Sequence, residues 1–143
     1  MSLNKRLQPF HLAIPVTDLH QAEAFYGGLL GSAKGRFSNQ WIDWDFFGHQ
    51  LVTHLVAAMP SPPSHNKVDN HGVPVPHFGV VLEWQEWQAL AEKLKKAGTN
   101  FIIEPYIRFK GKPGEQATLF LLDPSGNALE FKAFKDMGQL FVR

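Results

Sequence analysis

Two histidines and one glutamate occupy positions that would suit a metal ion. His11 and His77 each open a short apolar segment that we expect to be a strand. Glu130 lies in a largely apolar run near the C-terminus, where a buried carboxylate is costly unless it is paired with a cation or a metal. Two neutral imidazoles and one carboxylate form the facial triad that suits Fe(II), and the same set accepts Zn, Mn, Ni or Co. We therefore predict one divalent metal ion on these three residues, with positions left open for a substrate or O₂.

Each candidate ligand also has an explanation that needs no metal. A single histidine in an apolar strand is often a core residue that is hydrogen-bonded to backbone. Glu130 has two alternative partners for an ion pair, Lys132 two residues further on and Arg108 on a neighbouring strand. His54 is a fourth candidate ligand, or an acid/base beside the metal, because it lies on the last expected strand of the first half. It is equally explained as a core histidine.

The elements that position these residues repeat along the chain. His11 precedes the expected helix start at Asp18 by seven residues, and His77 precedes Trp84 by the same seven. A glycine ends each helical pattern, 20 residues after the first histidine and 21 after the second. An internal duplication of a βαβββ unit explains these coincidences together.

The expected fold is α+β, with paired βαβββ modules whose curved sheets form a cleft. We predict a single domain over residues 1–143, made of a first module at 8–58, a loop at 59–76 and a second module at 77–135. Asp18, with Gln21 at the capping-box position, should start the first helix. The expected strands cover 10–16, 34–37, 40–47, 50–57, 77–83, 101–109, 116–122 and 127–134.

The segment 59–76 differs in kind from its neighbours. It carries five prolines and shows no apolar periodicity, so we expect an exposed loop that acts as a linker or a functional lid. His65 and His71 in this segment could close over the metal site. His20 and His49 are expected to face solvent.

Composition limits the classes of function. A formal net charge of +1, without a basic run, makes nucleic acid a poor partner. The chain has no cysteine, so a metal must be bound through nitrogen and oxygen. Neither a signal sequence nor a stretch approaching the ~20 apolar residues of a membrane span is found. We expect a cytoplasmic protein that acts on a small molecule and does not bind a membrane.

Two segments resemble a known superfamily. Residues 10–16, followed by Asp18 and by Ala24-Phe25-Tyr26, look like the opening of a vicinal-oxygen-chelate module. Residues 122–130, Leu-Asp-Pro-Ser-Gly-Asn-Ala-Leu-Glu, resemble its closing Asp-Pro-x-Gly-Asn-x-x-Glu signature. The turn in this signature starts the last strand at a fixed register and so aims the glutamate inward. The resemblance covers nearly the whole chain, from about residue 10 to 134.

The resemblance implies a metal in the cleft and a substrate that chelates it through two neighbouring oxygens. The set of His11, His77 and Glu130 is similar to the iron triad of extradiol ring-cleaving dioxygenases, which favours Fe(II). These enzymes commonly have a tyrosine ten residues before the ligand glutamate, and this chain has Phe120 there. Tyr106, His54 or a histidine of the 59–76 loop would then have to supply the catalytic hydrogen bond.

Two other functions stay open within the superfamily. A glyoxalase-type lyase or isomerase with Ni, Zn or Mn needs a fourth ligand, which His54 could supply. A metal-free binding or resistance protein would hold a flat ligand on aromatic side chains, for which Trp41, Trp44, Phe46 and Phe47 are candidates. Homodimerisation is expected in either case, since curved sheets of this size leave edges to cover.

Overall fold

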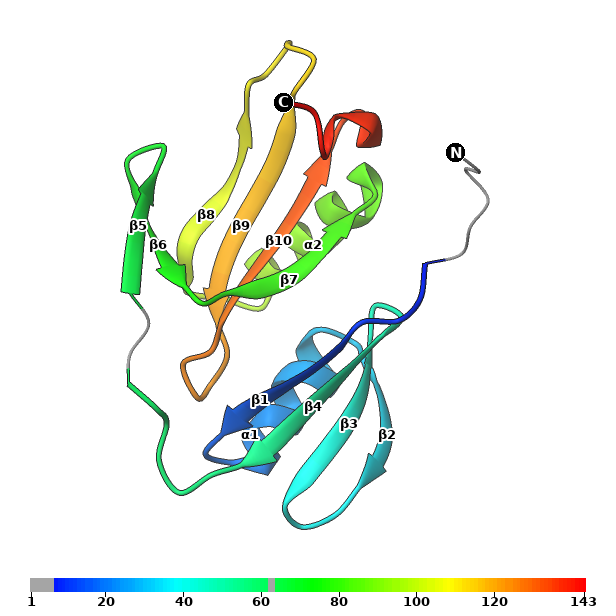
Figure 1. The fold of residues 1–143 in the computed structure, drawn as a ribbon, viewed down its shortest axis with the longest axis vertical. Coiled ribbons are helices and arrows are strands. Elements are labelled where there is room, and N and C mark those ends of the chain that lie inside the picture. The colour runs from blue at the N-terminus through cyan, green and yellow to red at the C-terminus, as the bar shows by residue number, and fades with distance from the viewer. Residues whose placement is uncertain (1–6, 62–63) are drawn as a thin grey trace. The chain divides into compact units, whose positions relative to one another are not determined.

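The computed structural model describes residues 7–61 and 64–143. The chain divides into two compact units between Met59 and Pro60, within the segment that separates the two expected modules. Each unit contains the element order βαβββ, and the fold is α+β as predicted (Figure 1). None of the helices among the described residues is long and apolar enough to cross a membrane.

The first unit is a four-stranded sheet with one helical segment on one face (Figure 1). The strands are ordered β1-β4-β3-β2, so that the first strand lies parallel to the last. In chain order the elements are β1 (His11–Val16), α1 (Leu19–Ala22), η1 (Glu23–Leu29), β2 (Ala33–Phe37), β3 (Trp41–Phe46) and β4 (His49–Leu55).

The first helix starts as the sequence predicts but does not stay α-helical. Asp18 is the N-cap, and its Oδ1 accepts the backbone N–H of Gln21 at 3.0 Å. From Glu23 the helix widens to a π-helix, which periodicity had not indicated. A Cβ at Gly27 would lie 3.1 Å from the buried Trp44 ring, so this glycine lets the indole pack closely against the helix.

The second unit has the same sheet plan. Its strands are ordered β7-β10-β9-β8, again with the first parallel to the last. Helix α2 covers one face, and the Trp87 indole N–H on this helix donates to the carbonyl oxygen of Phe131 at 2.8 Å. The elements are β7 (Phe78–Leu82), α2 (Trp84–Lys96), β8 (Phe101–Arg108), β9 (Gln116–Leu122), β10 (Ala128–Phe134) and the short 3₁₀ helix η2 (Met137–Gln139).

The strand registers of the two units correspond. Ala13 on β1 pairs with Val52 on β4, and Gly79 on β7 pairs with Glu130 on β10. Ala13 and Gly79 each lie two residues after the histidine of their own unit. The position that corresponds to Glu130 in the first unit is therefore the apolar Val52. A Cβ at Gly79 would lie 1.5 Å from the Glu130 carbonyl oxygen, so only glycine allows β7 to approach β10 this closely.

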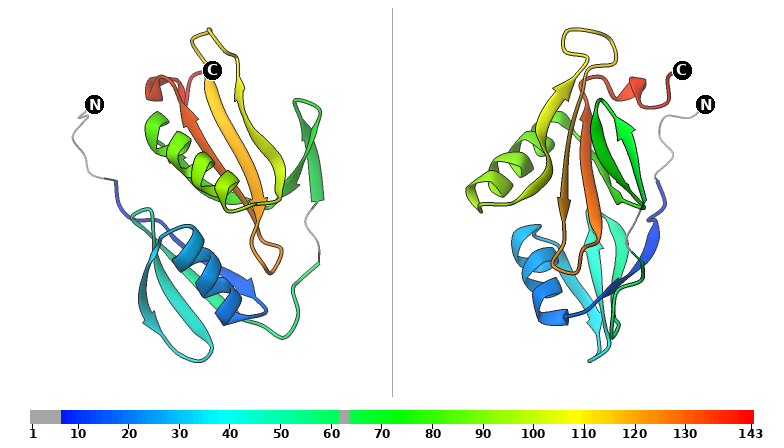
Figure 2. Two further views of the ribbon diagram at one scale, coloured as in Figure 1. Left: turned by 180° about the vertical axis from the view of Figure 1, so that it is seen from behind. Right: turned by 90° about the vertical axis from the view of Figure 1, so that its left-hand side faces the viewer.

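The expected loop at 59–76 contains a β-hairpin, so the prediction of a structureless segment is wrong. Strands β5 (Ser64–Val68) and β6 (His71–Val75) pair antiparallel. The connecting residues Asp69 and Asn70 have φ of +49° and +66°, the conformation of a two-residue hairpin turn. Figure 2 shows the hairpin and α2 on opposite sides of the second sheet. Prolines had concealed the strand pattern, although Asp and Asn each tolerate the positive φ that such a turn requires.

Candidate metal centre

Two of the three predicted ligands lie side by side in the second unit. His77 immediately precedes β7, and Glu130 points from β10 to the sheet face away from α2. The His77 Nε2 atom lies 3.2 Å from Glu130 Oε1. Their side chains are 28% and 17% exposed, so the pair is partly shielded from water but open on one side.

The structure fixes the orientation of the His77 ring. Its Nδ1 lies 2.7 Å from the carbonyl oxygen of Pro74, which can only accept, so Nδ1 carries the proton that is donated. The Phe120 ring meets the imidazole edge-on, with centroids 4.9 Å apart. Phe120, which replaces the expected tyrosine, thus packs against the ring instead of donating a hydrogen bond.

This orientation leaves the Nε2 lone pair of a neutral His77 facing a carboxylate oxygen. Two hydrogen-bond acceptors at 3.2 Å repel each other unless a cation lies on one of them. Either a second proton on the imidazole or a metal ion satisfies this requirement. A histidine whose Nδ1–H is held by a carbonyl is the usual form of a metal-ligating imidazole.

The other oxygen of Glu130 is held by a buried threonine. Thr118 Oγ1 donates to Glu130 Oε2 at 2.6 Å, which leaves Oε1 directed to His77. The alternative ion pairs considered for this carboxylate are absent among the described residues. Arg108 pairs with Asp69, its Nε lying 2.5 Å from Oδ2, and the Lys132 ammonium lies 5.4 Å from the Phe134 ring centroid.

A cavity of about 220 Å³ adjoins the His77–Glu130 pair. The hairpin forms one wall, where Val73 packs with Ile103 and Phe120 of the sheet. The sheet face away from α2 supplies the rest. The full lining is Val68, Val73, His77, Ile103, Tyr106, Arg108, Thr118, Phe120, Glu130 and Lys132. The cavity thus combines apolar walls with several convergent polar groups, as a small-molecule site does.

Tyr106, predicted as a catalytic hydrogen-bond donor, lines this cavity. Its hydroxyl donates to Asp69 Oδ2 at 3.0 Å, at the tip of the hairpin, and its ring lies 5.3 Å from that of His71. Burial raises the pKa of the Tyr106 hydroxyl above its ordinary value, and the hydrogen bond to Asp69 raises it further. The Tyr106 hydroxyl therefore keeps its proton, which it holds in the hydrogen bond to Asp69.

His11, the third predicted ligand, lies at the start of β1 in the first unit and is exposed. Its Nδ1 is 2.8 Å from Gln50 Oε1 on the adjoining strand, so Nδ1 donates and Nε2 is left with its lone pair. His11 and His77 thus carry the same tautomer through different partners. Within the parts of the chain that the structure describes, no three His, Asp or Glu side chains gather. The predicted triad draws on both units, and its grouping stays a prediction.

His54 is not placed to share a metal with His11. It pairs with Pro15 in the parallel register, four residues along β4 from Gln50, the partner of His11. Four residues of strand span about 13 Å, and side chains on one face of a sheet stand nearly parallel. His54 is exposed at the end of its strand, and its counterpart in the second unit is Lys132. The prediction that His54 acts in catalysis receives no support from these contacts.

Comparisons with known proteins agree with this plan. The family model for the glyoxalase/bleomycin resistance protein/dioxygenase superfamily matches residues 8–131. A glyoxalase/bleomycin resistance protein/dioxygenase structure from Alicyclobacillus acidocaldarius is 35% identical, with a TM-score of 0.75, and the match covers 97% of this chain and 100% of that one. The chain belongs to the glyoxalase/bleomycin resistance protein/dioxygenase superfamily.

More distant structures share the fold with this superfamily member. A glyoxalase/dioxygenase from Nostoc punctiforme is 16% identical, with a TM-score of 0.66, over 94% of this chain and 100% of that one. The fosfomycin resistance protein FosX from Listeria monocytogenes is 15% identical, with a TM-score of 0.68, over 95% and 100%. No curated protein matches the chain.

A divalent metal, which the superfamily implies, fits the donors of the second unit. His77 Nε2 and Glu130 Oε1 lie 3.2 Å apart on side chains that Pro74 and Thr118 hold, a separation at which both could bind one ion lying beside the pair at bonds of about 2 Å. Sequence reasoning predicted both residues as ligands but missed Thr118 and Pro74, which hold their side chains. Alternation along β9 did place a threonine beside Glu130 on the face away from α2, and that signal was available. No feature of the sequence pointed to the Pro74 carbonyl, because the hairpin was not expected.

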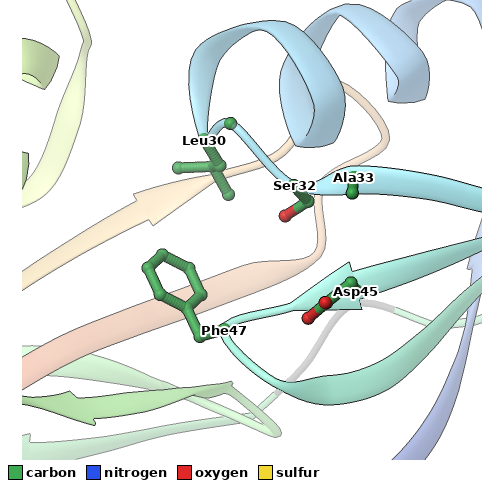
Figure 3. Close-up of a pocket in the computed structure, with 6 residues that line it drawn as sticks. Leu30, Ser32, Ala33, Asp45 and Phe47 are labelled. Carbon is green, nitrogen blue, oxygen red and sulfur yellow. The ribbon is translucent and has the colours of Figure 1, made fainter.

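A second pocket, in the first unit, shows no comparable chemistry. It has a volume of about 280 Å³ and is lined by the end of the helix, the start of β2 and the end of β3. Figure 3 shows Leu30 and Ser32 on one side, with Phe47 and Asp45 on the other. Its one titratable side chain, Asp45, accepts the backbone N–H of Gly48 at 2.8 Å and so serves the turn.

Proposed function

We propose that this chain is a metal-dependent enzyme that binds one divalent ion through His11, His77 and Glu130. The observation that supports it best is the His77–Glu130 pair, in which Nε2 of an imidazole held through its Nδ1 lies 3.2 Å from a carboxylate oxygen. The matching tautomer of His11 supports the third ligand. A metal bound here would act as a Lewis acid, lowering the pKa of a hydroxyl that chelates it.

We further propose that the site has three protein ligands and not four. In the register of the two sheets, the counterpart of Glu130 is Val52, which cannot bind a metal. A glyoxalase-type site with a fourth ligand would need His54, which the strand geometry of the first unit directs elsewhere. Three ligands leave room for a bidentate substrate and O₂, which favours Fe(II) and extradiol cleavage of a catechol-like compound.

The chain's own residues then have distinct roles. Pro74 and Thr118 hold the two ligands of the second unit in position. The apolar side chains of Val73, Ile103 and Phe120 exclude water from the substrate's ring. Tyr106 stands at the cavity wall, and its hydroxyl, which donates to Asp69 in this structure, would have to leave that carboxylate to become the hydrogen-bond donor that Phe120 cannot be.

Metal loading followed by oxygen uptake tests this function. Protein stripped with chelator and reloaded anaerobically with Fe(II) should retain about one ion per chain by elemental analysis and should consume O₂ when catechols are added. His77→Ala and Glu130→Ala should each abolish stoichiometric metal, because two ligands cannot retain it against chelator. His20→Ala, on the exposed face of α1, is the matched control and should bind normally.

The outcomes separate the levels of the proposal. A full iron complement without oxygen uptake on any catechol would remove the dioxygenase assignment and leave a metal site. Absence of stoichiometric metal with all of the first-row ions would reject the metal-dependent enzyme and favour a metal-free binding protein.

A further inference from the structure

One cation that lines the cavity has no carboxylate partner among residues 7–61 and 64–143. Lys132 lies on β10 two residues after Glu130, on the same face of the strand. Its cross-strand neighbours are Thr118 on β9 and Val81 on β7. The residue is half-buried, and its ammonium group contacts the Phe134 ring, away from Glu130.

The other charged groups around the cavity already have partners. Arg108 forms its ion pair with Asp69, and Glu130 is held by His77 and Thr118. Among the residues that the structure describes, the Lys132 ammonium has no ion pair. A half-buried cation supported only by an aromatic ring is weakly compensated, so an anion entering this cavity would meet an unmatched positive charge.

The size of the cavity limits what this anion can be. A volume of about 220 Å³ exceeds the roughly 150 Å³ of a cavity that holds benzene, so one substituted ring fits. Along the strand, Glu130 and Lys132 are about 6.6 Å apart. A single ring with oxygens at one end and an acidic group at the other spans a comparable distance.

We propose that Lys132 binds a carboxylate of the substrate, and that the substrate is a single-ring compound with two neighbouring oxygens and one carboxylate. This inference rests on the proposed function for the position of the two oxygens. Lys132 is then a specificity-determining residue, because it contacts the substrate but lies outside the reacting centre. Lys132 would not act on a substrate that lacks the acidic group.

Binding of two matched probes tests the role of Lys132. Catechol and 3,4-dihydroxybenzoate differ only in the carboxylate, and their dissociation constants are measured anaerobically by calorimetry with the full-length, metal-loaded protein. Wild type should bind the acid about tenfold more tightly than catechol, the effect of one charge-assisted contact. Lys132→Met, which keeps the length of the side chain, should abolish this preference and leave catechol binding unchanged.

Two further variants serve as controls. Lys132→Arg should restore most of the preference, since it returns the positive charge. Lys110→Met removes a lysine from the exposed β8–β9 connection and should change neither constant. A lysine that only packs its stem against Phe134 would give the same ratio of constants in wild type and Lys132→Met, and that result overturns the proposal. Failure of the acid to bind wild-type protein also overturns it.

Metal content, measured on the same samples, separates this inference from the proposed function. Protein that holds metal but shows no Lys132-dependent preference loses the specificity assignment and keeps the metal enzyme. Protein that holds no metal but still binds the acid through Lys132 keeps an anion site and loses the metal enzyme.

Discussion

At the scale of single residues, the site depends on Thr118 as a positioning residue for Glu130. The 2.6 Å hydrogen bond occupies one carboxylate oxygen and leaves the other directed to His77, where the proposed metal would bind. Thr118→Val removes the hydroxyl but keeps the branched shape. We expect metal affinity to fall about 10- to 100-fold, as for other groups that orient a ligand. Stability should fall by only about 1 kcal/mol. Competition with a chromophoric chelator and thermal unfolding of the apo protein measure the two effects.

Thr118→Ser provides the matched control for this prediction. It retains the hydroxyl and loses one methyl group, so metal affinity should return close to the wild-type value. Equal metal affinity in Thr118→Val and wild type would show that the carboxylate needs no such support. An equal loss in both variants would point to packing rather than to the hydrogen bond.

At the scale of elements, the hairpin is held to the sheet by a clamp of charge and hydrogen bonds. Asp69 at its turn accepts from Tyr106 and pairs with Arg108 on β8. The hydrogen bond from Arg108 is the largest cause that lowers the pKa of the Asp69 carboxyl below its usual range. The clamp therefore stabilises the folded hairpin fully above the ordinary aspartate pKa. Its contribution is lost as the pH falls through the lower, folded value.

Opening of the hairpin should follow this titration. Asp69→Asn should increase hydrogen exchange of the β5 and β6 amides at neutral pH, because the ion pair is lost while the turn conformation suits asparagine. In the wild-type protein, the exchange of these amides, corrected for intrinsic rates, should approach that of Asp69→Asn only at acid pH. Asp136→Asn, at the cap of η2, should leave the hairpin amides unchanged. Protection that is the same in Asp69→Asn and wild type at neutral pH would contradict the clamp.

The hairpin also shows where sequence reasoning succeeded and where it could not. Strands such as β9, at Gln116–Leu122, were predicted to the residue, because long apolar runs between turn signals leave little choice. The cap at Asp18 was confirmed for the same local reason. The hairpin was missed because its strands are short, polar and interrupted by Pro74, and their stability comes from Val73 packing on a distant sheet. The hydrogen bonds that hairpin residues make with His77 and Tyr106 were missed for the same reason.

The site prediction was also limited because its residues lie in two separate compact units. Repeats in the sequence identified His11 and His77 as equivalent, and the strand registers support this alignment within each unit. They also place Val52, and not His54, as the counterpart of Glu130, so His54 lies two residues, or about 6.6 Å, further along its strand. Contacts within a unit follow from periodicity and pairing. The proposed meeting of His11 with His77 and Glu130 would depend on how the two units pack, which periodicity does not encode.

At the scale of the whole molecule, the proposed triad links the stability of the two units. A metal held by residues from both binds only when both are folded, so it should raise the unfolding temperature of the full chain. At a free metal concentration 100 times the dissociation constant, the gain is about 2.7 kcal/mol. His11→Ala and His77→Ala should each lose most of this gain, although they lie in different units. Calorimetric scans of each variant with and without metal measure this metal-induced gain in stability. Gln50→Ala removes the hydrogen-bond partner of the His11 ring and should give an intermediate gain. Should His11→Ala keep the full metal-induced rise while His77→Ala loses it, the metal belongs to the second unit alone and the triad is wrong.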